Sequence, residues 1–252
     1  EDPERGFLPS TGRLSRLRFP DATQDVRVDA GVEEGDEVTV HYDPMIAKLI
    51  VWAPDRATAI ERLQQALEAT EVEGVRTNAR FLWQVLGAPA VRAGDVSTRL
   101  LETDPSLAPG VAAHEIHAAW LIAAAARLQS MPGDELGHAS HAASPWEAAT
   151  GFRLNGPASV RVALRLDVNG APASIAESQP LQHWLSFRRE AEGLAVVLDG
   201  KTHRVTLRRP ADEVLEGYVD GHPVRARVEL DHGRLIVRRH CLRFDFVEDT
   251  GA

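Results

Sequence analysis

Residues 113–131 have the sequence AHEIHAAWLIAAAARLQSM, and Pro132-Gly133 follows directly. The segment is dense in strong helix formers, and the Pro-Gly pair stops it, so it predicts one long α-helix. Apolar side chains such as Ile116 and Trp120 cover most of its circumference. A helix that is apolar on nearly all sides is normally surrounded by other structure. We therefore expect this helix to be enclosed by strands from a neighbouring part of the chain.

The residues after Ser144 supply those strands. Apolar and polar residues alternate with a period of two in 160–166, 224–228 and 242–246, as in half-buried strands. Four turn signals typical of β-hairpins lie between the alternating runs: Asn169-Gly170, Asp199-Gly200, Asp220-Gly221 and His232-Gly233. About seven or eight short antiparallel strands after one apolar helix predict a barrel wrapped around that helix.

The first hundred residues instead alternate strands and helices. Candidate strands and helix signals follow in this order: a strand around Leu14–Phe19, a strand at 27–32, an apolar strand at 45–52 typical of burial on both faces, a helix opened by Pro54-Asp55, and a helix capped by Asn78 and ended by Gly87 and Pro89. The pattern predicts a small α/β unit. We expect an α+β chain with this unit over 1–104, a breaker-rich linker over 105–112 and the helix plus barrel over 113–252.

Composition excludes several classes of protein. With 44% apolar and 26% charged residues in 252, the chain has the balance of a soluble globular protein. Its longest apolar run, Ala118–Ala126, is too short to span a bilayer. The net charge of −9 disfavours nucleic-acid binding, and a single cysteine, Cys241, indicates a reducing compartment. The start without Met or a secretion leader predicts a piece of a longer, non-secreted protein.

Phosphate-binding and metal-binding motifs are weak or missing. Neither G-x-x-x-x-G-K-[ST] nor G-x-G-x-x-G occurs, so no phosphate loop is expected. His114 and His117 are spaced one residue short of H-E-x-x-H, and His138 and His141 lie in a predicted loop. Zinc requires three or four converging ligands, and nothing fixes a third one here. We expect no metal site, and surface or partly buried histidines instead.

Two cations in the first unit are candidates for chemistry. Arg27 lies on a predicted strand, where its planar guanidinium can bind a carboxylate, bicarbonate or enolate oxygen. The commoner alternative is a surface arginine paired with a neighbouring acid. Lys48 lies inside an apolar run and should need a partner such as Asp43 or an acid on the next strand. For Lys48 a structural role is favoured over an active-site role.

Arginines also alternate with apolar residues along the predicted strands of the C-terminal half. We expect them to form a solvent-facing side of the barrel, more than a surface that binds a partner.

Seven short segments resemble the C-terminal part of biotin carboxylase, in order along residues 1–102. They are Glu1-Asp2-Pro3, Phe7–Gly12, Val26-Arg27-Val28-Asp29, Tyr42–Leu49, Asp55-Arg56, Gly74–Asn78 and Ala93-Gly94-Asp95. The variant Val40–Pro44 with Ala47 is most similar to the biotin-bearing α subunit of methylcrotonyl-CoA carboxylase, a ligase of leucine degradation. Ser144-Pro145-Trp146 and Gly151–Asn155 are similar to the segment that leads into the subunit-docking (BT) barrel of such subunits.

The resemblance implies a function and a catalytic residue. Enzymes of this family use ATP, Mg and bicarbonate to carboxylate biotin, and a carboxyltransferase β subunit then passes the carboxyl group to the acyl-CoA. Arg27 matches the arginine that contacts bicarbonate and the biotin ureido oxygen, which makes it both the catalytic and the cofactor-binding residue. The resemblance places the ATP-grasp region before Glu1 and the biotinyl lysine after Ala252. An isolated chain should therefore be inactive.

The same resemblance names partners and a compartment. It implies contacts with the β subunit, the biotin carboxyl carrier domain and bicarbonate, with no nucleic acid and no membrane. The location would be cytoplasmic in a bacterium and the mitochondrial matrix in a eukaryote. Two alternatives stay open: the α subunit of a propionyl- or geranyl-CoA carboxylase, and a non-catalytic interaction module in which only the barrel acts.

Overall fold

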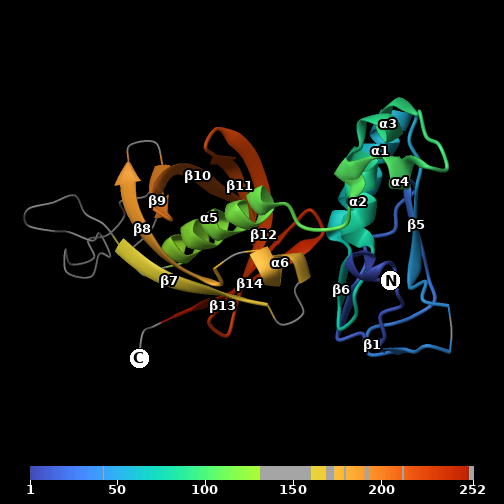
Figure 1. Cartoon of the computed structure of the whole chain (residues 1–252), viewed down its shortest axis with the longest axis horizontal. Helices are drawn as coiled ribbons and strands as arrows, with labels where there is room; N and C mark the ends of the chain where they lie inside the picture. The colour runs from blue at the N-terminus through green and yellow to red at the C-terminus, as the bar shows by residue number, and fades with distance from the viewer. Residues whose placement is uncertain are drawn as a thin grey trace, which may run out of the picture. The chain divides into compact units, whose positions relative to one another are not determined.

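The computed structural model describes residues 1–41, 43–130, 160–168, 173–178, 180–190, 193–211 and 213–249. The chain forms two compact units, the first mainly Glu1–Gly110 and the second mainly the residues from Val111 onward. The first combines helices with two-stranded sheets, and the second is a helix with a closed antiparallel barrel (Figure 1). The predicted α+β class is confirmed. No helix in these ranges is both long and apolar enough to cross a membrane.

The first unit is built from short elements. In chain order they are η1 (Pro3–Arg5), β1 (Gly12–Arg13), β2 (Arg16–Arg18), β3 (Val26–Ala30), β4 (Glu37–Val38), β5 (Ala47–Val51), α1 (Arg56–Ala69), β6 (Glu71–Glu73), α2 (Ala79–Gly87), α3 (Pro89–Ala93), α4 (Leu100–Thr103) and η2 (Pro105–Leu107). Three antiparallel pairs make its sheets: β1 with β4, β2 with β6 and β3 with β5. Helix α1 packs against β5 and α2 and so covers one side of the β3–β5 pair.

The helix signals of the sequence are largely confirmed. The Asp55 carboxylate caps α1 by accepting hydrogen bonds from the Thr58 backbone N–H (2.9 Å) and hydroxyl (2.7 Å). Asn78 does precede α2, but its side chain makes no capping hydrogen bond. Helix α2 ends at Gly87 as expected, and Pro89 begins a separate short helix, α3, because its fixed φ suits the first position of a helix.

The expectation that residues 45–52 form a strand buried on both faces is wrong. Burial alternates along β5, so that Ala47, Leu49 and Val51 are partly covered while Lys48 and Ile50 are exposed. The physical reason is that α1 lies against only one side of this two-stranded sheet. An apolar run of strand length therefore says little about how many layers cover it.

Residues just before the second unit are packed rather than loose. Leu107 of η2 is only 2% exposed and lies in a small apolar cluster with Ala88 and Val91. Asp104 caps η2 by accepting the Ser106 backbone N–H at 2.9 Å. Part of the segment that the sequence marks as rich in helix breakers is thus folded onto the helices of the first unit.

The second unit encloses the long helix predicted from the sequence. Helix α5 (Ala113–Gln129) is followed by β7 (Val160–Asp167), α6 (Ala173–Ser178), β8 (Gln182–Glu190), β9 (Gly193–Leu198), β10 (Lys201–Ala211), β11 (Val214–Val219), β12 (His222–Asp231), β13 (Arg234–Arg239) and β14 (Leu242–Glu248). The barrel order is β10-β11-β12-β13-β14-β7-β8-β9, and β9 closes it on β10. In Figure 1 α5, drawn in green, runs inside these strands. Ile116, Trp120 and Ile122 are each 1% exposed, which confirms the enclosure.

Hairpin turns occur where the sequence predicted them. Asp199-Gly200, Asp220-Gly221 and His232-Gly233 all have two positive φ angles, as two-residue turns of this kind require. A fourth turn, His240-Cys241, has the same conformation (φ 48° and 60°) without glycine, so the sequence pattern missed it. The predicted turn Asn169-Gly170 and the motif residues of 131–159, including His138 and His141, lie outside the described residues.

Candidate functional site

The β3–β5 pair presents one open face that carries Arg27. In the antiparallel register Arg27 lies opposite Ile50, and Asp29 lies opposite Lys48. Because side chains alternate along a strand, these four share one face, and all of them are exposed. The other face carries Val28 and Leu49 toward the unit's interior. The open face therefore combines two cations, one carboxylate and an apolar side chain.

Arg27 is positioned by one acidic neighbour and is otherwise accessible. Its side chain is 70% exposed, and Nη2 donates to Oδ2 of Asp29 at 2.8 Å. The two residues are two apart on the strand, which puts them on the same face. A guanidinium has further N–H donors in a fixed fork, so this ion pair leaves donors for the oxygens of a second anion. The geometry suits recognition of a carboxylate, bicarbonate or enolate oxygen.

An arginine that the sequence analysis did not single out fixes the ends of this sheet. Arg62 of α1 pairs with Oδ2 of Asp25 at 3.0 Å and also donates to the carbonyl oxygen of Trp52. Asp25 precedes β3 and Trp52 follows β5, so one side chain ties both strands to the helix. The sequence gave no signal for the ion pair, since Asp25 lies 37 residues before Arg62 along the chain.

The N-cap of α1 adds a second constraint next to β5. The backbone N–H of Thr58, and then its hydroxyl, hold the pKa of Asp55 below its usual range by stabilising the carboxylate. The Asp55 carboxylate is therefore charged at neutral pH. Its negative charge also interacts favourably with the positive end of the α1 helix dipole.

Two kinds of partner were expected for Lys48, and of these Asp43 is not beside it, whereas an acid on the neighbouring strand, Asp29, lies opposite it. Asp43 instead accepts the Met45 backbone N–H at 2.9 Å and so shapes the turn before β5. Lys48 points to the open face and forms no ion pair within the described ranges; its cross-strand neighbour is Asp29. Asp43 and Lys48 are thus not brought together, and Lys48 joins Arg27 on the open face. Tyr42 of the same motif lies outside the described residues.

Two of the motif segments that are distant in sequence meet within the first unit. The Arg76 backbone N–H donates to Oγ of Ser10 at 2.9 Å. Gly74 has φ +99°, and a Cβ at this position would lie 1.9 Å from the carbonyl oxygen of Arg13. Only glycine permits both this backbone conformation and this approach, which explains why the segment Gly74–Asn78 begins as it does.

A cavity of about 620 Å³ lies between β5 and the helices of the first unit. Its lining is mainly aliphatic, with Leu49, Leu63, Leu67, Leu82 and Leu86 among the residues. Lys48 is part of the lining, whereas Arg27, Asp29 and Ile50 of the open β3–β5 face are not.

The histidines of α5 do not build a metal centre in the part of the chain that the structure describes. His114 is exposed, whereas His117 lies against His203 of β10. Within the described ranges no group of three or more His, Cys, Asp or Glu side chains is placed to hold a metal ion. Both ring contacts of His203 are made within the protein, to His117 and to Asp220.

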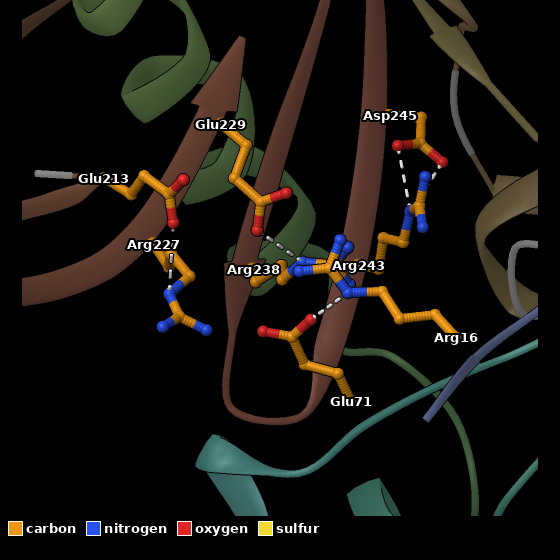
Figure 2. A network of polar contacts seen from close by, with 8 residues as sticks. All are labelled: Arg16, Glu71, Glu213, Arg227, Glu229, Arg238, Arg243 and Asp245. Carbon is orange, nitrogen blue, oxygen red and sulfur yellow. Dashed lines mark hydrogen bonds and ion pairs between the residues drawn. The ribbon is translucent and has the colours of Figure 1, made fainter. Parts of the chain in front are cut away.

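Many arginines of the barrel are paired with acids. Figure 2 shows three such pairs of the second unit: Arg227 with Glu213, Arg238 with Glu229 and Arg243 with Asp245, at 3.7, 3.2 and 2.9 Å. It also shows Arg16 with Glu71, a pair of the first unit that joins β2 to β6. Of the three pairs of the second unit, only Arg227 with Glu213 is well exposed, whereas Arg238 and Glu229 are only 14% and 13% exposed. None of these ion pairs identifies a partner by itself.

The comparisons with known proteins concern the first unit above all. Residues 1–103 match the family model "Biotin carboxylase C-terminal domain". The α subunit of mitochondrial methylcrotonoyl-CoA carboxylase from Mus musculus is 47% identical over 98 residues, which are 39% of this chain and 14% of that protein. Its counterpart from Dictyostelium discoideum is 37% identical over 157 residues, covering 62% of this chain and 22% of that protein.

A third relative extends over the second unit. The propionyl-CoA carboxylase α chain of Ruegeria pomeroyi is 33% identical over 263 aligned residues, covering 94% of this chain and 35% of that protein. This chain therefore spans between about a seventh and about a third of the length of these relatives. The resemblance inferred from the sequence motifs is confirmed for the carboxylase domain and for its homology to biotin-dependent carboxylases.

Proposed function

We propose that this chain, whose residues 1–103 are a biotin carboxylase C-terminal domain, works within the α subunit of a biotin-dependent acyl-CoA carboxylase. Such an enzyme carboxylates biotin with ATP and bicarbonate and then transfers the carboxyl group to an acyl-CoA. The observation that carries the proposal is the family match over a unit whose open face presents Arg27. The proposal assigns residues 1–104 to the carboxylase lobe, 105–112 to a linker and 113–252 to a docking barrel.

In this proposal Arg27 is the catalytic and cofactor-binding residue. Its free N–H donors would bind bicarbonate and the ureido oxygen of biotin on the open face of β3–β5. When biotin loses its N–H proton, negative charge develops on that oxygen, and a fixed guanidinium stabilises it. The accessible fork and its single anchor at Asp29 support this role.

The remaining parts of the reaction are assigned to other regions of the longer protein. ATP and Mg would bind in an ATP-grasp region, and biotin would be attached to a lysine of a carrier domain. The barrel would dock the α subunit on a carboxyltransferase β subunit. Support for the last point comes from the propionyl-CoA carboxylase α chain, whose similarity continues across the barrel residues.

The acyl-CoA that fits the comparisons best is methylcrotonyl-CoA. Over the first unit, the identity to the Mus musculus methylcrotonoyl-CoA carboxylase subunit is 47% over 98 residues, against 41% over 102 residues for the propionyl-CoA carboxylase α chain of Caenorhabditis elegans. The relatives include proteins described as mitochondrial, so the proposed location is the mitochondrial matrix in a eukaryote and the cytoplasm in a bacterium.

The test replaces Arg27 in the complete α subunit. We expect Arg27→Ala to lower bicarbonate-dependent carboxylation of free biotin by about 100-fold, as loss of one oxyanion-type donor does, with ATP affinity unchanged. Arg99→Ala is the matched control, because Arg99 is an equally exposed arginine of the same unit (77%). Normal carboxylation by the Arg27 variant would show that this arginine is only a surface residue.

A second assay addresses the acyl-CoA and the docking partner. The α subunit is mixed with its candidate β subunit, and fixation of labelled bicarbonate is measured with methylcrotonyl-CoA and with propionyl-CoA. Preference for propionyl-CoA would overturn the substrate assignment but not the carboxylase assignment. Failure of the two subunits to associate would overturn the docking role of the barrel.

A further inference from the structure

A chain of three titratable side chains links the inner helix to the barrel wall. His117 of α5 is half-buried, and its Nε2 lies 3.2 Å from Nε2 of His203 on β10. The opposite nitrogen of His203, Nδ1, lies 2.7 Å from Oδ2 of Asp220 in the β11–β12 turn. The His203 side chain is 12% exposed and the Asp220 side chain is 44% exposed, so the pair of imidazoles is better shielded from solvent than the carboxylate.

The carboxylate at the end of this chain is held in place by the backbone. The Arg204 N–H donates to Oδ1 of Asp220, and the Asp220 N–H donates to the Arg204 carbonyl oxygen, both at 2.8 Å. Burial alone would raise the pKa of Asp220, but the hydrogen bonds from His203 and Arg204 bring it below its usual value. Asp220 is therefore a carboxylate held in a fixed position, and it accepts a hydrogen bond from the Nδ1–H of His203.

Whether His117 and His203 can hydrogen-bond to each other depends on how many protons the two imidazoles carry. With Nδ1–H of His203 directed at Asp220, a neutral His203 offers the lone pair of Nε2, and His117 donates its Nε2–H to it. If His203 takes one proton, His117 can switch tautomer and accept instead. A second proton puts two N–H groups face to face at 3.2 Å, which removes the hydrogen bond and opposes two positive charges.

We propose that His117, His203 and Asp220 form a proton-operated latch, which holds α5 to β10 while the two imidazoles carry at most one charge and releases it when both are protonated. This latch lies within the second unit and does not depend on the proposed carboxylase function.

Other charged groups around His117 modulate the latch without replacing it. Asp199 in the β9–β10 turn and Asp220 favour its protonation, whereas Lys201 of β10 opposes it. Asp199 is already bound to His183 of β8 at 2.8 Å. On the other strands that pack against α5, β9 has no titratable side chain, Glu216 of β11 pairs with Arg208, and Arg239 of β13 pairs with Glu115. The buried side chains of β12, which also packs against α5, are Val224, Ala226 and Val228 and carry no charge.

The expected direction of the pH dependence follows from the fold. Loss of hydration, and then the charge of His203, lower the pKa of His117 from its ordinary value of 6.5. Because the unfolded chain then binds a proton more readily than the folded one, the latch contributes fully above about pH 6.5 and is lost as the pH falls below it. The lowered pKa of Asp220 keeps its own contribution intact until much lower pH.

The test measures hydrogen exchange of the α5 amides from residue 117 onward in the 252-residue chain, at about pH 7.5 and about pH 5.5. After correction for intrinsic exchange rates, protection in the unmodified chain should fall by about tenfold or more on acidification. His117→Gln keeps a polar side chain but cannot titrate, so its protection should change by less than about threefold. His114→Gln, a change at an exposed histidine of the same helix, should behave like the unmodified chain.

Two results would overturn the latch: protection of α5 in the unmodified chain that does not change with pH, or a fall in His117→Gln as large as in the unmodified chain. If His117→Gln does not fold, the ring nitrogens of the unmodified chain are titrated by NMR. The latch predicts that the second imidazole protonates together with a change in the α5 amide signals. Two independent titrations near the ordinary value, with unchanged α5 signals, would refute it.

Discussion

The ion pair between Arg239 of β13 and Glu115 of α5 should be the electrostatic contact on which the barrel depends most. Nη1 of Arg239 lies 3.3 Å from Oε2 of Glu115, and the two side chains are only 9% and 6% exposed. Replacing Arg239 with Met removes this cation from a carboxylate that is almost fully buried. A broken buried pair costs about 3–5 kcal/mol of the free energy of unfolding.

The expected loss of unfolding free energy in Arg239→Met is modified by the helix dipole and is checked against a surface pair. Glu115 lies in the first turn of α5, where the helix dipole offsets about 0.3–1 kcal/mol of the cost. Arg208→Met is the matched control, because Arg208 pairs with Glu216 at 2.7 Å on the same barrel but is 79% exposed. That surface pair should be worth about 0–1 kcal/mol. The double variant Glu115→Leu/Arg239→Met removes both charges and should recover most of the lost stability.

The assay is urea unfolding of the chain labelled with fluorotryptophan and followed by ¹⁹F NMR. Trp120 of α5 reports on the second unit, and Trp83 of α2 reports on the first. We expect the Trp120 transition of Arg239→Met to move to lower urea while the Trp83 transition stays in place. A loss no larger than that of Arg208→Met, or a double variant as unstable as the single one, would refute the reasoning.

Three further outcomes are expected. Trp120→Asp should unfold the barrel at a cost of about 3–5 kcal/mol, because Trp120 is 1% exposed and packs on His183 and Phe246. Circular dichroism should detect this unfolding, whereas the control Trp184→Asp should stay folded, because Trp184 is 59% exposed. Gly74→Ala should lower the stability of the first unit by more than about 1–3 kcal/mol in thermal unfolding, since a Cβ would meet the Arg13 carbonyl at 1.9 Å, whereas Gly31→Ala has open space and should be neutral. The 252-residue chain alone should show no bicarbonate-dependent ATP hydrolysis above background, and measurable turnover would contradict the assignment of ATP binding to another region.

Local patterns in the sequence determined much of the architecture. The apolar circumference of residues 113–131 predicted an enclosed helix, because such a surface is too costly to leave in water. Period-two alternation and Asp-Gly or His-Gly turns predicted the hairpins, since both depend on neighbours within a few residues. The motif segments identified the biotin carboxylase domain and with it Arg27 as a site residue, whose role remains a proposal.

Only the tertiary structure decided which side chains meet and how deeply they are covered. The sequence could not show that Lys48 is exposed beside Asp29, because burial of a strand depends on how many layers lie against it. It could not pair Arg62 with Asp25, Arg239 with Glu115, or His117 with His203, since these partners are joined by folding across long separations. Short-range pattern fixes local structure through backbone sterics and hydration, whereas contacts between distant residues follow only once the chain has closed on itself.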